Sequence, residues 1–175
     1  MNLEKRTKGI SKGNSRVIFM TVLLLILFQT LQAQEPPPRP ITVTVTAQIL
    51  SFGAFTLGAV GGTVAITAGG SRNATGDVIL LGLGYPFSAA LYQIVANPGT
   101  VISLLNGPDV SLTGSNGGSM ILHIGASSPA SPFVTNAIPP LSNPLTIGGT
   151  LTVGNLVSNP AGNYTGTFDV TFVQE

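Results

Sequence analysis

The chain has 175 residues, no cysteine and a formal net charge of +1 at pH 7. Most of its basic residues precede residue 17. Beyond residue 33 two basic side chains face five acidic ones, a net charge of −3 without any lysine. Nucleic-acid binding needs clustered cations to neutralise phosphates, so this class of function is excluded. Without disulfides, stability has to come from packing and backbone hydrogen bonds.

Residues 1–33 have the pattern of a secretory signal peptide. A basic stretch is followed by the uncharged apolar run Val17–Phe28, and Ala33 is the small residue at the expected cleavage point. A membrane-spanning helix needs about 20 apolar residues, and this run is shorter; an uncleaved anchor is the alternative. We therefore expect a secreted protein of the periplasm, outer surface or extracellular space, with no stable membrane span after cleavage.

The segment that follows predicts a stiff lead-in and then a strand. Residues 34–40 are rich in proline, which favours an extended chain. Residues 41–49 then alternate between apolar and polar side chains, the period of a half-covered strand. The apolar side chains of its one face are Ile41, Val43, Val45, Ala47 and Ile49.

Further strands are predicted between glycine and proline residues, at 63–67, 78–83, 85–95, 101–105, 120–124, 151–157 and 164–173. The run 78–83 is continuously apolar and predicts a strand covered on both faces. Asn97–Thr100 suits a type II turn, and 128–144 is interpreted as a long surface connection. The core face of the last strand is expected to be Phe168, Val170 and Phe172.

Many short strands without a helical pattern favour an all-β fold. We expect one antiparallel immunoglobulin-like β-sandwich over residues 41–175, with a small barrel as the alternative. A Gly-Gly-Thr-apolar motif occurs at Gly61–Val64 and again at Gly148–Leu151. We interpret the two copies as two similar hairpin entries.

Several segments resemble a family of exported bacterial β proteins, domain of unknown function 4402. They are Leu145–Val153, Pro160–Phe172, Leu50–Phe55, Gly61–Val64 and Ser71–Gly76. The Pro-Ala-Gly-x-Tyr-x-Gly-x-Phe part is also similar to the last strand of spore-coat-U and fimbrial subunit domains. The resemblance implies a pilin-like sandwich and carries no catalytic residues, although many fimbrial subunits have a disulfide that this chain lacks.

The sequence contains no motif for catalysis, and we expect neither an enzyme nor a cofactor. The single histidine, His123, shares a strand face with Ile121, and Asp109 and Asp169 are distant in sequence. Acid–base or metal chemistry needs an oriented second group, so we interpret His123 as structural. Asp77 and Asp109 stand beside loops and are weak candidates for calcium.

Two functions stay open. The first is an exported structural protein of pilin-like fold that assembles with itself by β-strand addition. In it Ile41, Val43, Val45 and Ile49 would form the strand-exchange face, although 41–49 could equally be an ordinary strand of its own sheet. The second is a monomeric secreted binding module, an adhesin or glycan binder, for an envelope or extracellular ligand. Phe133 is its candidate loop aromatic.

Overall fold

Every regular element between residues 39 and 175 of the computed structural model is a β-strand, as the alternating pattern predicts. The structure describes residues 39–175, and the predicted signal peptide and residues 34–38 lie outside this range. Since these residues contain no helix, none of them forms a helix that could cross a membrane.

The strands are β1 (Thr42–Val45), β2 (Ser51–Phe52), β3 (Phe55–Ile66), β4 (Arg72–Leu80), β5 (Phe87–Ser88), β6 (Ala90–Val95), β7 (Val101–Asn106), β8 (Val110–Gly114), β9 (Ser119–Ser128), β10 (Phe133–Val134), β11 (Asn143–Val153), β12 (Tyr164–Thr165) and β13 (Val170–Gln174).

The large sheet is built around β11. Its path is β1-β6-β11-β9-β8-β12, and β3, which also pairs with β4, joins it at β11. On one side β11 pairs first with β6 and then with β3, while β9 runs along the other side, all antiparallel. Gly148 stands at this change of partner, where a Cβ atom would come within 2.3 Å of the Ile66 carbonyl oxygen. Only glycine allows so close an approach.

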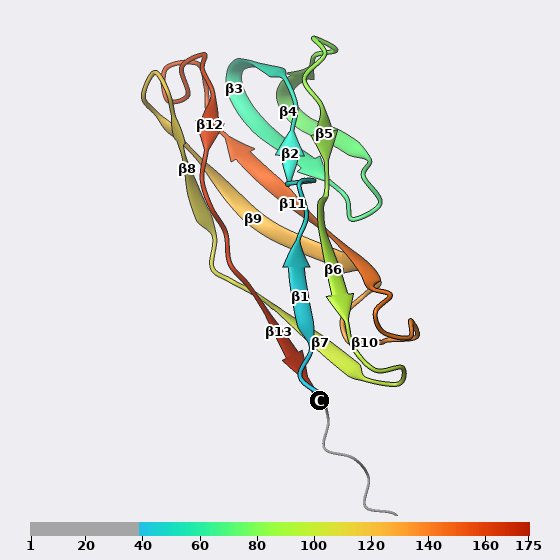
Figure 1. Cartoon of the computed structure of the whole chain (residues 1–175). Helices are drawn as coiled ribbons and strands as arrows, with labels where there is room; N and C mark the ends of the chain where they lie inside the picture. Colours follow the sequence, from blue (N-terminus) through green and yellow to red (C-terminus); the bar gives the residue numbers. More distant parts are fainter. Residues whose placement is uncertain (1–38) are drawn as a thin grey trace, which may run out of the picture. The chain divides into compact units, whose positions relative to one another are not determined.

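A small sheet, β10-β7-β13, packs on the inner face of the strongly curved large sheet (Figure 1). Ile102 of β7 is fully buried, and the ring of Phe172 in β13 lies 5.4 Å from the ring of Tyr92 in β6. The predicted type II turn joins the two sheets between β6 and β7. It is confirmed by the positive φ of Gly99 and by the bond from the Thr100 N–H to the carbonyl of Asn97.

The first predicted strand is shorter than its sequence pattern. β1 ends at Val45, because the next residues form a bulge opposite Leu91. The Thr46 N–H donates to the carbonyl of Leu91, whose own N–H donates to the carbonyl of Gln48. Across the bulge the register shifts by two residues, from Val45 opposite Tyr92 to Ser51 opposite Ser88. Beyond it Ile49 is exposed, and the core-facing residues are Leu50 and Phe52.

Three other predicted boundaries were wrong. Residues 78–83 are not covered on both faces, because Ile79 of β4 is 62% exposed. The predicted connection 128–144 contains β10 and the start of β11. The strand predicted at 151–157 is the end of β11, which stops at Val153.

The predicted last strand, 164–173, is divided between the two sheets. β12 pairs with β8 in the large sheet, and β13 pairs with β7 in the small one. The chain crosses from sheet to sheet between Thr165 and Val170. Phe133, predicted as a loop aromatic, is only 7% exposed because it packs into the core from β10.

The two Gly-Gly-Thr copies are not hairpin entries. They lie inside the long strands β3 and β11, which pair with one another so that Leu151 is opposite Val64 and Thr152 is opposite Thr63. The repeated motif therefore marks two neighbouring strands of one sheet.

The side chain of Arg72 joins the two-stranded sheet formed by β2 and β5 to β4, the edge strand of the large sheet. Its guanidinium donates to the carbonyls of Phe52 and Ala54 at 3.1 and 3.2 Å, and to that of Leu81 at 3.2 Å. The same group lies 4.5 Å from the centre of the Phe87 ring. The planar guanidinium thus joins β2, β4 and β5, a geometry that lysine cannot reproduce.

We expect Arg72→Met to lower the free energy of unfolding by about 2–3 kcal/mol, because three carbonyls lose a charged donor. Urea unfolding of the purified protein measures this. Arg39→Met is the matched control, since Arg39 is exposed and its loss should change the free energy of unfolding by less than about 0.5 kcal/mol. Equal losses in the two variants would contradict the role of Arg72.

Candidate functional site

Two edge strands lie on the same flank of the fold. β1 ends the large sheet beside β6, and β13 ends the small sheet beside β7. The contact between Phe172 and Tyr92 brings β13 against β6, the strand that β1 borders. Figure 1 shows the two edge strands running in opposite directions. We call the free edges of β1 and β13, with the inner side of β1, the open flank.

The free edge of β13 carries unpaired backbone groups. The Gly107 N–H donates to the carbonyl of Asp169 at 3.0 Å, and the N–H of Glu175 donates to the carbonyl of Val101 at 3.1 Å. The odd-numbered residues of β13 therefore bond β7, because bonding alternates along an antiparallel pair. The residues whose N–H and C=O groups point to the free edge are Val170, Phe172 and Gln174.

The free edge of β1 has the same character. Thr46 bonds Leu91 of β6, and the register of the pair continues this alternation through Thr44 and Thr42. The backbone groups that point away from β6 therefore belong to Ile41, Val43 and Val45.

The side chains predicted for strand exchange differ in how far they are exposed to solvent. Ile41 and Val43 pack against the core, whereas Val45 is 69% and Ile49 65% exposed. In the last strand, Phe168, Val170 and Phe172 are half-buried and pack against the core.

Val45 is exposed although it faces inward. It stands opposite Tyr92, which is buried, and directly opposed residues project to the same face of a sheet. The small sheet ends at β13, so no strand of the described residues covers the inner side of β1 at this point. The open flank is therefore a place where one strand of the small sheet could still be added.

The open flank lacks two of the usual protections of edge strands, charge and proline, although β1 is short and ends at the bulge opposite Leu91. Natural edges carry charges, prolines or bulges, or are very short. β10 and β12 have two residues each, and β4 carries Arg72 and Asp77. Between their first and last residues, β1 and β13 contain no charged side chain and no proline.

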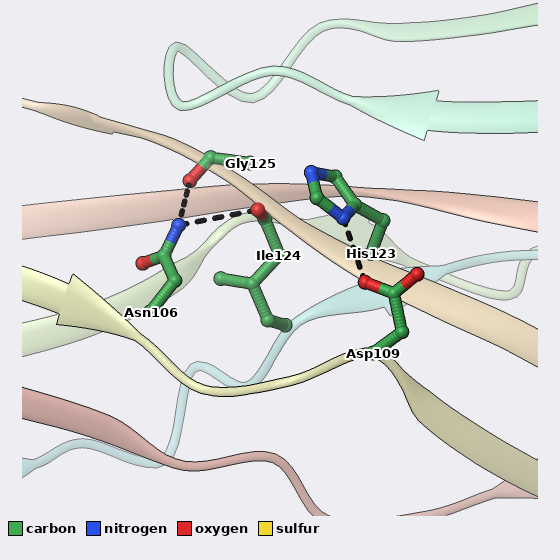
Figure 2. A network of polar contacts seen from close by, with 5 residues as sticks. All are labelled: Asn106, Asp109, His123, Ile124 and Gly125. Carbon is green, nitrogen blue, oxygen red and sulfur yellow. Dashed lines mark hydrogen bonds and ion pairs between the residues drawn. The ribbon is translucent and has the colours of Figure 1, made fainter.

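His123 has a partner that sequence reasoning missed. Its Nδ1 lies 2.7 Å from Oδ1 of Asp109, as Figure 2 shows, and both side chains are more than half exposed. Nearby, the side-chain amide of Asn106 donates to the carbonyls of Ile124 and Gly125. A solvated pair of this kind contributes little to stability. β8, which was not predicted from the sequence, pairs with β9 and so brings Asp109 beside His123.

The two aspartates considered for calcium have separate partners. Asp77 accepts bonds from the backbone N–H groups of Ala59 and Val60, in the irregular part of β3, and Asp109 faces His123. Within residues 39–175 no group of three or more histidine, aspartate or glutamate side chains is close enough to share a metal ion.

Tyr92 gives a test of how closely the open flank is packed. Burial raises the pKa of the Tyr92 hydroxyl above its ordinary value of 10.0, because the phenolate would be poorly solvated. The stabilisation is complete below pH 10 and is lost as the pH rises through the higher folded-state pKa, since only the unfolded chain ionises easily. We expect Tyr92→Phe to weaken the loss of unfolding free energy between pH 7 and pH 11, measured by urea unfolding. An equal loss in both proteins would contradict this burial.

Searches of curated proteins and of solved structures found no match. A family model described as "Domain of unknown function (DUF4402)" matches residues 41–173, which include all of β1 and most of β13. The match covers well over half of the chain and confirms the predicted resemblance to this family, while the similarity to spore-coat-U and fimbrial subunit domains stays a prediction. The chain therefore belongs to the DUF4402 family.

Proposed function

We propose that the protein is an exported structural protein of the cell envelope or exterior that assembles through β-strand addition. The observation that carries this proposal is the open flank, where two edges without charge or proline and an uncovered inward-facing valine occur together. Backbone bonds along such an edge supply affinity, and inward side chains supply specificity.

The strand order supports an immunoglobulin-like, pilin-like sandwich with one position vacant. In that fold the first, second, fifth and fourth strands form one sheet in the order ABED, and C, F and G form the other. With β1 as A, β6 as B and β7 as C, β9 takes the place of D, β11 of E and β13 of F. The large sheet then has the order ABED, and β7 and β13 form the CF pair. The vacant G position lies beside β13, at the open flank.

Export is supported by the leader pattern of residues 1–33. The segment that follows, residues 34–40, is poorly suited to be the strand that is added to a neighbouring edge. Four of residues 34–40 are prolines, which have no N–H to give to a neighbouring edge. The added strand has to come from a segment with free N–H groups at alternate positions.

The test has a localisation part and an assembly part. We expect the protein expressed in a bacterial host to be recovered outside the cytoplasm with Gln34 as its first residue. We expect the purified, processed protein to show a mass that rises with concentration in analytical ultracentrifugation. Recovery only from the cytoplasm, or a strictly monomeric protein, would sink the proposal.

A charge placed on the open flank should prevent assembly, because charged side chains protect edges from strand addition. We expect Val45→Lys to weaken self-association at least about tenfold, since desolvating a lysine costs more than 1.4 kcal/mol. Ile79→Lys is the matched control, because Ile79 is similarly exposed on the edge strand β4. Equal effects of the two lysines would place the contact elsewhere.

A second candidate function, a secreted binding module, has a specific observation in its favour. With Phe133 buried, the exposed aromatics lie in and beside the β4–β5 connection, where Tyr85 is 64% and Phe87 44% exposed. An aromatic ring there offers an amphipathic contact surface. In this case Tyr85→Ala would abolish binding on a glycan array without changing the unfolding midpoint, and an array without any bound glycan would dismiss the candidate.

A further inference from the structure

We propose that the open flank is filled by a second copy of this chain, so that β1 of each copy pairs with β13 of the other in a closed dimer. The inference rests on the proposed assembly by strand addition and names its partner and its geometry. It makes the assembly unit a two-fold pair in place of an open fibre.

The directions of the strands suit this pair. β1 and β13 of one copy run in opposite directions (Figure 1). A two-fold rotation about an axis parallel to the strands preserves the direction of each strand. β1 of the second copy therefore meets β13 of the first antiparallel, and the reverse contact forms at the same time, as an isologous interface requires.

The backbone groups of the two edges are complementary. β1 presents the N–H and C=O groups of Ile41, Val43 and Val45, and β13 presents those of three residues with the same two-residue spacing. Phe172 touches Tyr92, which stands opposite Val45, so Phe172 and Val45 lie at similar positions along the strand direction. The rotation keeps this position, so Val45 of the second copy comes close to Phe172 of the first. Each contact can then form an antiparallel ladder.

The side chains also fit. The same rotation turns the inner side of β1 in the second copy toward the inner side of β1 in the first. The 69% exposed Val45 of each copy is then covered by the other copy, and the half-buried Val43 loses its remaining exposure. Both apolar surfaces leave water in one contact.

Other arrangements of two copies leave part of the open flank unused. In a pair joined through β13 and β13, β6 and β1 of the second copy would lie against β13 of the second copy. That space is already occupied by β1 of the first copy. A lone peptide beside β13 would cover Val45 but leave the edge of β1 free. The closed dimer satisfies both edges of both copies.

Engineered cysteines test the pairing directly, because the chain has none of its own. Thr44 is exposed on the outer face of β1, and Thr171 and Val173 lie on the outer face of β13. Within one copy these faces belong to different sheets and point apart. Across the proposed contact, Thr44 stands opposite Thr171 or Val173 at a site without hydrogen bonds, where Cα atoms come about 4.5 Å apart and a disulfide can form.

The experiment uses the exported, processed protein with Thr44→Cys combined with Thr171→Cys or with Val173→Cys. We expect one of these double variants to give a covalent dimer under mild oxidation, seen on a non-reducing gel and by intact mass. The single variants and the pair of Thr44→Cys with Ile79→Cys should stay at the mass of one chain. Adding Val45→Lys to the productive pair should reduce the covalent dimer at least about tenfold, by the same desolvation.

The failures of the two proposals are distinguishable. If Val45→Lys prevents self-association while neither double variant forms a dimer, strand addition stands and the closed dimer is wrong. Covalent species larger than two chains would likewise overturn the closed geometry. If Val45→Lys leaves self-association unchanged, the proposed function itself fails. Circular dichroism and the unfolding midpoint of each variant show that it is folded.

Discussion

The hydrogen bonding of β11 on both of its sides is the constraint on which the rest of the fold depends. One side of this strand is shared by β6 and β3, and the other is taken by β9. Every further strand of the large sheet is joined through one of these three. The place of β1, and with it the open flank, is fixed by where β11 exchanges β6 for β3 at Gly148, a position that admits no side chain.

Alternation in the sequence predicted strands well and their ends poorly. Residues 41–49 alternate without interruption, yet the pairing is broken opposite Leu91, where one residue bonds both Thr46 and Gln48. The alternation of apolar and polar side chains indicates which face of a strand is covered. It does not indicate where extra residues interrupt the hydrogen bonding of the backbone. The same limit applies to residues 164–173, which alternate smoothly across a change of sheet.

The candidate site could be predicted only in part for a related reason. Ile41, Val43 and Phe172 were named from their apolar rows, and all three pack against the core. That Val45 is left uncovered follows from the end of the small sheet at β13, which no local pattern contains. The pairing of His123 with Asp109 depends on β8, whose five residues are too short and glycine-bounded to stand out from a loop.

The crossing of the chain between sheets near its last strands also sets an order of events during synthesis. β12 pairs with β8, and β13 pairs with β7. Both pairings need residues 164–174, which are synthesised about 60 residues later than β7 itself. Until then Ile102 and Leu104 lack their cover on that side. The small sheet therefore cannot be completed until nearly the whole chain has been made, although the central strands of the large sheet are all present by Val153.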